Sequence, residues 1–408
     1  MAIEHAETLI VGGGQSGLTA SHMLSRRGRP HIVLERARIA ERWRTERWDG
    51  LRFQFPNWSV RLPDFVFPHG DPDGFTTSPE IVAFLTAYAD FIAAPVRCGI
   101  TVTRLQRDGA GFRAETSAGP IEADNVVVAT GPYQRPVMPT LLQGQPGLFQ
   151  VHASLYRAPD QLPPGGVLVI GSGASGAQIA EELIRAGRRV FLSVGHHRRM
   201  PRRYRGHDLI WWLVEMGLDR TPVEKRGPDK ALPLITGAYG GHTIDFREFA
   251  TQGITLLGRV VARRDGALEI APDLADNLAA GDAAYGAFLD LVDAYVARRG
   301  LEVPTEPGAR TRLADPLDVR DPIRRLDLGA AGISAVVWST GYACDFSWID
   351  LPVFDAEGQP IHRAGITGVP GLYFLGLQWL SKMNSSFLSG VADDAERLAA
   401  HIAGRRNP

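Results

Sequence analysis

A glycine-rich turn between two apolar segments near the start of the chain most limits how this sequence can fold. Residues 8–11 form a short apolar run, which is long enough for one buried parallel strand. The sequence GGGQSG follows at once, and then come a helix-like segment at 18–27 and a second apolar run at 31–34. This order predicts one βαβ unit with its glycines at the first turn.

Three glycines of this turn, Gly12, Gly14 and Gly17, fit the GxGxxG pattern. The first permits a tight turn, the second lets the backbone approach a pyrophosphate, and the third lets helix and strand pack closely. Glu35 follows Gly17 by 18 residues, where an acid accepts hydrogen bonds from a ribose hydroxyl. A glycine-rich turn without function is the alternative, but strand, helix and terminal acid together favour a site for an adenine dinucleotide.

A second copy of this unit begins 159 residues after the first. An apolar run at 167–170 leads into GSGASG, with Gly171, Gly173 and Gly176 in register, and a helix-like segment and another strand follow. Two such patterns are far less expected by chance than one. The chain is therefore predicted to hold a second dinucleotide site.

The second copy ends its second strand without an acid. Ser193 and Val194 stand there, and the run HHRRMPRRYRG, with Arg198 and Arg199, comes next. A carboxylate would repel a ribose 2′-phosphate, whereas a hydroxyl and guanidinium groups would receive it. Ser193, Arg198 and Arg199 are thus candidates for that contact, and NADPH is favoured over NADH. A solvated basic loop is the alternative.

An aromatic stretch at 43–75 interrupts the regular pattern between the two copies. It carries Trp43, Trp48 and Trp58 among Arg and Pro residues. Loops of this length inside a compact domain are uncommon, and functional loops are frequent among them. We expect this stretch to contact cofactor or substrate, with plain packing as the alternative.

Further elements complete an α/β pattern. Ser78 is predicted to cap a helix that reaches residue 91, because Pro79 and Glu80 follow it. A buried strand ends in the Thr-Gly pair of residues 126–131, and residues 335–342 repeat that pattern. Small residues at such strand ends allow close approach to a ligand.

The last third of the chain is less regular. Residues 259–270 predict a hairpin around an Asp-Gly turn, and residues 274–298 predict one long helix, or two broken near Gly281. Ser385 or Ser386 is expected to open a final helix. Its N-terminus would offer a dipole to the first cofactor, so the C-terminal segment is expected to rejoin the N-terminal domain.

Composition narrows the class of protein. The chain has 408 residues, enough for two or three domains, and a formal net charge of −1, so no overall field indicates nucleic acid. Its only cysteines, Cys98 and Cys344, cannot form a CxxC pair, a zinc cluster or a disulfide framework. We therefore exclude a dithiol reductase centre and expect no metal site.

Targeting signals are not evident in the sequence. The start, MAIEHAETLI, lacks the basic and apolar regions of a signal peptide. No stretch approaches the roughly 20 apolar residues that a bilayer span needs. A cytoplasmic protein without a membrane span is the expectation.

Taken together, these motifs resemble the flavin-containing monooxygenases, within the flavoproteins that have two dinucleotide-binding domains. The resemblance spans nearly the whole chain and rests on GGGQSG, WRTERWDGLRFQFPNW, VVATGPYQRPVMP, HASLYR, GSGASG, WSTGY and GLYFLGL. The segments PNW, DPDGF, RRMPRRYRG and GLQWL are similar to those of bacterial flavoprotein monooxygenases and flavin-dependent oxidoreductases.

This resemblance implies an α/β fold with two Rossmann-like domains, the NADPH domain being inserted in a discontinuous FAD domain. The FAD domain would comprise residues 1–160 and 331–408, and the NADPH domain residues 161–330. FAD and NADPH are the cofactors implied. The expected cofactor contacts are Gly12, Gly14, Gln15, Ser16, Gly17, Glu35, Arg36, Trp43, Thr130, Gly131, Gly171, Gly173, Ser175, Gly176, Ser193, Arg198, Arg199, Thr340, Gly341, Gly376 and Ser385.

The sequence departs from the family at the loop that faces the flavin. Many relatives carry Asn two residues before the loop proline, whereas this chain has Gln54 there and Asn57 just after Pro56. The resemblance makes Gln54 and Asn57 the catalytic candidates, as amide donors to the flavin or its oxygen adduct. Asn57 as the cap of a turn is the alternative.

Other polar residues resemble the family or have an expected role. GLFQVHASLY keeps the family's His152 and Tyr156 but lacks its Gly, and His152 is expected to hold the joint between domains. Lys382 and Asn384 are expected to meet substrate or flavin, or to be ordinary turn residues.

The function implied is transfer of one oxygen atom from O2 to a small organic substrate through a flavin C4a-hydroperoxide. Two alternatives stay open: an NADPH-dependent flavin reductase that does not oxygenate, and a nucleotide-sensing regulatory subunit. The partners expected are the substrate and O2, not nucleic acid, and a homodimer is left open.

Overall fold

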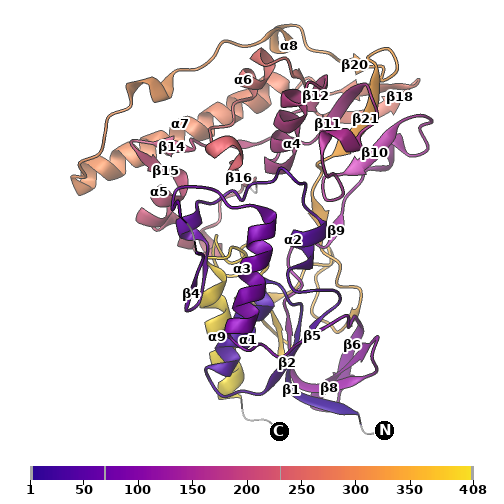
Figure 1. Cartoon of the computed structure of the whole chain (residues 1–408), viewed down its shortest axis with the longest axis vertical. Coiled ribbons are helices and arrows are strands. Elements are labelled where there is room, and N and C mark those ends of the chain that lie inside the picture. Colours follow the sequence, from indigo (N-terminus) through magenta and orange to yellow (C-terminus); the bar gives the residue numbers. More distant parts are fainter. Residues whose placement is uncertain (1–2, 69, 230, 406–408) are drawn as a thin grey trace.

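Two sheets with parallel cores organise the chain in this computed structural model, which describes residues 3–68, 70–229 and 231–405. One sheet forms the lower part of the molecule in Figure 1 and the other the upper part. In strand order, the parallel core of the first sheet is β5 (Val96–Cys98), β2 (His31–Glu35), β1 (Glu4–Val11), β8 (Ile121–Val128) and β26 (Leu372–Phe374).

The second sheet has the same layout. Its parallel strands, in the matching order, are β17 (Thr255–Leu257), β12 (Val190–Ser193), β11 (Gly166–Ile170), β21 (Ile333–Trp338) and β10 (Phe149–His152). All of these strands lie in the chain between β8 and β26. The predicted fold class is thus confirmed, with two Rossmann-like units, the second inserted in a discontinuous first. We call the two sheets with their helices the first body and the second body.

The matching layout explains the repeat at 126–131 and 335–342. β8 and β21 are the fourth strands of their sheets, so each ends beside the glycine-rich turn of its own body. The second sheet reaches beyond the predicted range of 161–330, because β10 precedes that range and β21 follows it. Residues 331–338 therefore pair in the second body and not in the first.

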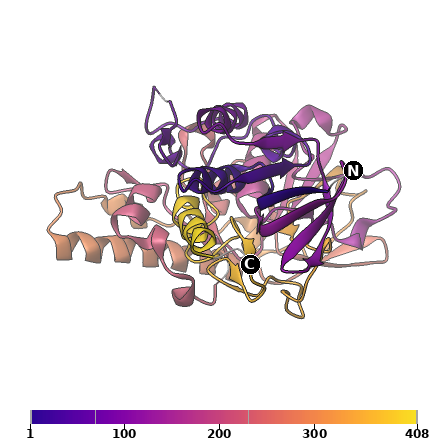
Figure 2. The same cartoon turned by 90° about the horizontal axis from the view of Figure 1, so that it is seen from below.

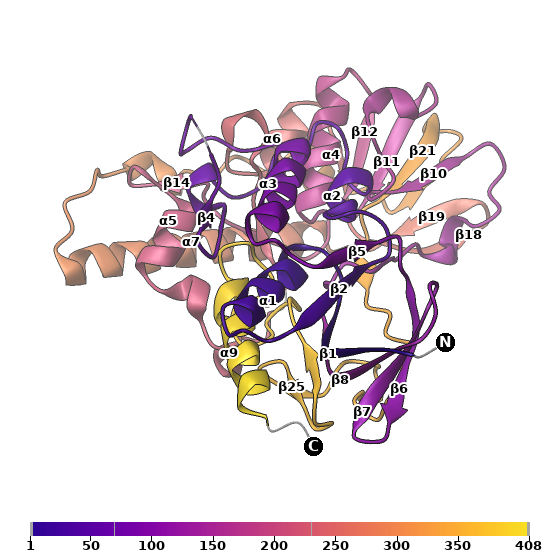
Figure 3. The ribbon, with the colours of Figure 1, turned by 60° about the horizontal axis from the view of Figure 1, so that its bottom comes forward.

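Helices lie against both sheets. α1 (Gln15–Ser25) and α9 (Val391–Gly404) lie side by side in the first body, with α3 (Ser78–Phe91) nearby (Figure 1 and Figure 3). In the second body α4 (Ala174–Arg185) follows β11, as α1 follows β1. The C-terminal helix thus rejoins the N-terminal body, as predicted.

Two helix starts differ from the prediction. Thr77, not Ser78, caps α3, because its side chain accepts from the backbone N–H of Glu80 while the Glu80 carboxylate accepts from that of Thr77. α9 begins at Val391 rather than at Ser385 or Ser386. The hydroxyl of Ser385 accepts from two backbone N–H groups of the preceding turn, which holds this segment out of the helix.

The long helix α7 (Leu274–Arg299) is continuous. Gly281 does not break it, and glycine is needed at this position because a side chain there would press on the ring of His197. Figure 2 shows α7, in orange, extending beyond the rest of the second body. The hairpin of β18 (Val260–Arg264) and β19 (Ala267–Ile270) forms as predicted.

The remaining elements are short, or join the first sheet at its edge. The helices are α2 (Glu41–Thr45), α5 (Leu209–Glu215), α6 (Phe246–Thr251) and α8 (Leu317–Arg320), and the strands are β3 (Arg61–Leu62), β4 (Phe65–Val66), β6 (Val102–Asp108), β7 (Gly111–Thr116), β9 (Arg135–Pro136), β13 (Arg198–Arg199), β14 (Arg203–Tyr204), β15 (His207–Asp208), β16 (Pro233–Leu234), β20 (Arg325–Leu326), β22 (Tyr342–Ala343), β23 (Ile349–Asp350), β24 (His362–Arg363) and β25 (Ile366–Thr367). Within the described ranges, no helix combines the length and apolar character that crossing a membrane requires.

Candidate functional site

Both glycine-rich turns line one cavity of about 1000 Å³. Gly12 and Gly14 reach it from the first body, and Gly173 and Ser175 reach it from the second. Clefts of this size suit organic ligands, and cavities between domains are common sites for them. The fold therefore brings the two predicted dinucleotide motifs to the same space.

The first turn has the backbone that its pattern requires. Gly12 has φ +115°, and a Cβ there would lie 2.6 Å from the carbonyl oxygen of Ala129 at the end of β8. A Cβ on Gly17 would collide with the carbonyl oxygen of Gly12. At Gly14, a Cβ would meet no atom within 4 Å. A side chain therefore does not fit at Gly12 or Gly17, whereas free space remains at Gly14, where a pyrophosphate is expected.

The second turn repeats this geometry. Gly171 has φ +105° and faces the carbonyl oxygen of Ser339 after β21, and a Cβ on Gly176 would collide with the carbonyl oxygen of Gly171. The middle glycine, Gly173, again has open space. Each turn precedes the N-terminus of a helix, whose free N–H groups attract phosphate.

Glu35 lies at the cavity, at the end of β2. Its Oε2 accepts from the backbone N–H of Gly13 at 2.8 Å, and its Oε1 accepts from that of Ala37 at 3.0 Å. A carboxylate has further lone pairs beyond these two bonds. Glu35 is thus fixed in orientation and can still accept from a ribose.

Most of the predicted cofactor contacts meet in this cavity. The predicted residues that line it are Gly12, Gly14, Gln15, Ser16, Glu35, Arg36, Trp43, Gln54, Thr130, Gly131, Gly173, Ser175, Gly176, Gly341 and Gly376. The predicted residues outside its lining are Gly17, Asn57, Gly171, Ser193, Arg198, Arg199, Thr340 and Ser385.

The two catalytic candidates are separated by the structure. Gln54 lines the cavity, and its Nε2 is 3.4 Å from the carbonyl oxygen of Ile235, a long hydrogen bond. Asn57 is buried, and its Nδ2 donates to the carbonyl oxygen of Asp71 at 2.9 Å. Asn57 therefore closes a turn of the aromatic stretch, which speaks against direct contact with a ligand.

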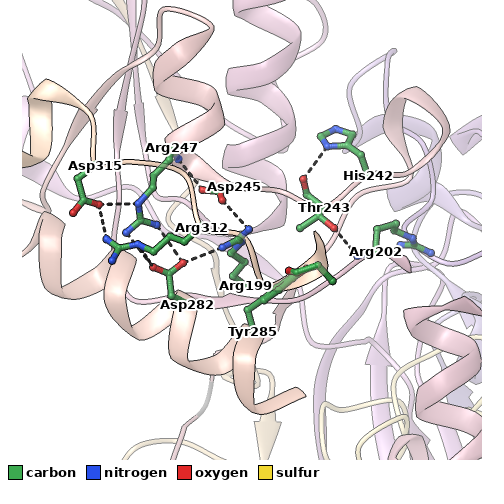
Figure 4. A network of polar contacts seen from close by, with 11 residues as sticks. Arg199, Arg202, His242, Thr243, Asp245, Arg247, Asp282, Tyr285, Arg312 and Asp315 are labelled. Carbon is green, nitrogen blue, oxygen red and sulfur yellow. Dashed lines mark hydrogen bonds and ion pairs between the residues drawn. The ribbon is translucent and has the colours of Figure 1, made fainter. Parts of the chain in front are cut away.

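Ser193 and Arg199 are occupied elsewhere. The hydroxyl of Ser193 is buried and donates to the carbonyl oxygen of Gly258 at 3.0 Å. The guanidinium of Arg199 pairs with Asp245 at 2.7 Å and with Asp282 at 2.9 Å (Figure 4). Both placements speak against the predicted contact with a 2′-phosphate, because these side chains already bond protein groups. The spacing of residues in the sequence does not show which way a side chain points.

Thr340 and Ser385 also serve the fold. The hydroxyl of Thr340 donates to the carbonyl oxygen of Val137, which links the segments after β21 and β8. Ser385 is fully buried in the turn before α9, whereas its neighbour Ser386 lines the cavity.

His152 lies at the joint between the two bodies. Its Nε2 is 3.1 Å from the carbonyl oxygen of Gly341, and its ring meets that of Tyr342 edge-on. Burial lowers the pKa of this imidazole. These contacts fit the structural role expected for it.

Lys382 and Asn384 tie the C-terminal segment in place. The Nζ of Lys382 donates to the carbonyl oxygen of Gly390 at 2.7 Å and lies 3.1 Å from Asp393. The Nδ2 of Asn384 donates to Asp219 at 2.9 Å. Neither side chain lines the cavity, but Met383 between them does.

One end of the cavity is apolar, and the sequence did not reveal it. Its lining there comes from four separate segments: Phe53, Phe55, Leu209, Ile210, Leu213, Leu234, Ile235, Met383 and Phe387. α5 supplies Leu209, Ile210 and Leu213, but nothing in its sequence shows which face meets the aromatic stretch. Only the tertiary fold assembles this surface beside Gln54.

Arg202 fastens the aromatic stretch to the second body. This buried guanidinium donates from Nη1 to the carbonyl oxygen of Gln54 at 2.7 Å and from Nε to Asp208 at 2.8 Å. It also stacks on Phe75 at 4.5 Å. The sequence grouped Arg202 with a basic loop, whereas the structure shows a joint between the two bodies.

No metal centre is evident in the parts of the chain that the structure describes. No group of three or more His, Cys, Asp or Glu side chains in those ranges is placed to hold an ion. The polar side chains that line the cavity include Glu35, Arg36, Gln54 and Gln134.

Known proteins resemble this chain along its whole length. The family model of the pyridine nucleotide-disulphide oxidoreductases matches residues 9–210. A CzcO-like oxidoreductase of Geobacillus kaustophilus is 32% identical over 400 residues, which are 97% of this chain and 98% of that protein. The indole-3-pyruvate monooxygenase YUCCA8 of Oryza sativa is 27% identical over 421 residues, which are 97% of this chain and 90% of that protein.

Solved structures share the fold. The flavin-containing monooxygenase of Stenotrophomonas maltophilia has a TM-score of 0.66 and 20% identity, over 98% of both chains. Together with the full-length match to an oxidoreductase, the shared fold agrees with the resemblance that the motifs indicated. The chain belongs to the family of the CzcO-like oxidoreductases.

Proposed function

We propose that the protein is a cytoplasmic FAD- and NADPH-dependent monooxygenase that transfers one oxygen atom from O2 to a small organic substrate. The observation that carries this proposal is the pair of matching glycine turns that open onto one cavity. The first turn would hold FAD and the second NADPH, as in the family that the motifs resemble. The monooxygenase names of YUCCA8 and of the S. maltophilia protein agree with it.

The residues at the first turn fit FAD. The space at Gly14 leaves room for a pyrophosphate, and the start of α1 presents N–H groups to it. Glu35 lies at the cavity for a ribose hydroxyl. At the second turn, Gly173 and the start of α4 offer the same cradle to NADPH.

The apolar end of the cavity supports oxygen chemistry. Bound cofactors would supply the hydride and the activation of O2, while the chain binds them, orients them and excludes water. Phe55, Leu213 and Phe387 cover this end. A substrate bound there would lie beside Gln54, shielded from solvent.

Gln54 is the amide that we propose at the reacting centre. It lines the cavity, and its long bond to Ile235 leaves the amide N–H free to turn toward a ligand. Asn57 has neither property. The substrate itself stays open among amines, sulfides and carbonyl compounds.

The proposal is tested with purified protein, NADPH and air, with a panel of amines, sulfides, ketones and 2-oxo acids scored by product. A monooxygenase forms oxygenated product in proportion to the NADPH consumed. NADPH oxidation with equivalent hydrogen peroxide and no product across the panel would identify a reductase. No NADPH oxidation by flavin-loaded protein would favour the nucleotide sensor.

A further inference from the structure

The strand ends of the two βαβ units are joined to their glycine turns by hydrogen bonds that run in opposite directions. In the first unit, the backbone N–H of Gly13 in the turn donates to the carboxylate of Glu35 at the strand end. In the second, the backbone N–H of Gly195 at the strand end donates to the hydroxyl of Ser172 in the turn, at 3.0 Å. Ser172 stands where the first unit has Gly13.

This exchange removes the need for an acid at the second strand end. Val194 stands in the place of Glu35 and is fully buried, so it presents no polar group to a ribose. The acceptor now lies on the turn, and the strand end presents backbone. A phosphate on the ribose of a bound dinucleotide would therefore meet no carboxylate at the end of β12.

Arg259 takes the space beside this strand end. The buried hydroxyl of Ser193 donates to the carbonyl oxygen of Gly258 at 3.0 Å and accepts from the backbone N–H of Val260 at 3.2 Å. These two bonds hold the turn that carries Arg259 against β12. The Cγ and Cδ of Arg259 lie 3.7 Å from the position that a Cβ on Gly195 would occupy.

The guanidinium of Arg259 is oriented and accessible. Its Nε donates to Asp273 at 2.5 Å, and Asp273 also accepts from its backbone N–H at 3.0 Å. The side chain is 63% exposed, and its two terminal nitrogens have no hydrogen-bond partner among the described residues. Asp273 thus fixes one side of the fork and leaves the other side for an anion.

The arginines of the loop at 198–205 are less available to an anion than Arg259, because most of them already bond protein groups. Arg199 lies in an ion-pair network with Asp245 and Asp282, as Figure 4 shows, and Arg202 is buried against Asp208. Arg203 donates to the carbonyl oxygens of Gly240 and Gly241, and Arg205 donates to Asp293. Arg198 is partly exposed but lines a separate small pocket with Asp229, which also pairs with His196.

We propose that Arg259 selects NADPH over NADH by receiving the 2′-phosphate of its adenosine ribose. This inference rests on the proposed function, in which NADPH occupies the second turn. An arginine near the end of this strand is the feature that accommodates a 2′-phosphate in dinucleotide-binding folds. Here it is supplied by the neighbouring turn between β17 and β18.

The test measures binding, not turnover. Isothermal titration of the purified, flavin-loaded protein gives the Kd of 2′-phospho-ADP-ribose and of ADP-ribose. Arg259→Ala should weaken binding of the phosphorylated ligand by about ten- to a hundredfold and leave ADP-ribose unchanged, because only the charged hydrogen bonds to the phosphate are lost. Arg264→Ala, on the same hairpin and 72% exposed, is the matched control and should change neither value.

A second variant guards against an indirect effect. Gly195→Asp places a carboxylate beside Arg259, where its Cβ makes only ordinary contact with that side chain. It should abolish the preference for the phosphorylated ligand while ADP-ribose still binds.

An unchanged ratio of the two Kd values in Arg259→Ala overturns the inference, as does a wild-type protein without preference. A shift in Arg198→Ala alone would assign the phosphate to the arginine-rich loop instead. If the wild type binds neither ligand, the assignment of the second turn to NADPH fails as well, so the two failures are distinguishable.

Discussion

Two glycines of the first turn are required for different reasons. Gly14 and Gly17 stand three positions apart in one turn, yet a Cβ on Gly14 meets nothing within 4 Å whereas one on Gly17 collides with a carbonyl oxygen. The backbone of Gly14, with φ −88°, is open to any residue. One glycine is therefore required by the ligand and the other by the fold.

Gly14→Val should consequently fold but purify without bound FAD, since its side chain would occupy the space of the pyrophosphate. Gly17→Val should fail to fold, because α1 could no longer pack against β1. Flavin absorbance per protein and a circular dichroism melt of both variants check this. A yellow, fully loaded Gly14→Val protein would contradict the assignment of the first turn.

Glu182 carries a pH dependence of stability. Burial raises the pKa of this carboxyl above its ordinary value of 4.5, and the hydrogen bond from Tyr156 offsets this only in part. The folded state thus holds the proton more tightly than the unfolded state, so stability falls as the pH rises from 4.5 through the folded pKa. Glu182→Gln, which still accepts from Tyr156, should lose less Tm between pH 4.5 and 8 than the wild type. Parallel Tm curves for the two proteins would contradict this.

At the scale of elements, the aromatic stretch depends on contacts that local sequence does not encode. The turns and strands were predictable because apolar runs and glycines act locally. The stretch is held instead by Arg202 and by Gly237, where a side chain would strike Phe53 and Phe75. Likewise, the sequence does not encode that Ser193 and Arg199 turn toward protein partners, and the apolar end of the cavity needs four segments that the fold alone assembles.

Arg202→Met should destabilise the protein by about 3–5 kcal/mol, because it leaves Asp208 buried without its partner. Adding Asp208→Asn should restore part of the loss, since asparagine still caps α5. Urea unfolding measures both variants. Arg203→Met, an exposed neighbour, is the control and should cost little. Equal losses for Arg203→Met and Arg202→Met would contradict the role of Arg202 as a joint.

At the scale of the molecule, the second body is defined by its sheet. β10 and β21 lie outside the range that the sequence predicted for it, and β21 pairs with both β10 and β11. The sequence could not assign β21, because its Thr-Gly ending copies that of β8. Equivalent places in two similar sheets produce similar sequences.

A chain covering residues 147–343 should therefore fold alone, whereas one covering 161–330 should not, because the latter loses two strands and leaves β11 without a partner on one side. Cooperative thermal unfolding by circular dichroism separates the two. A cooperative transition in the shorter chain alone would contradict this assignment of the strands.

The place of β26 in the first sheet also sets an order of assembly during synthesis. β26 pairs with β8 through Leu372 and Val126, which are 246 residues apart in the chain. A ribosome that has made residues 1–343 has supplied every strand of the second sheet, while the first still lacks β23, β24, β25 and β26. The inserted body can close as a unit on the nascent chain, and the first must keep β8 open until translation is nearly complete. The body that begins the chain is thus the last to be finished.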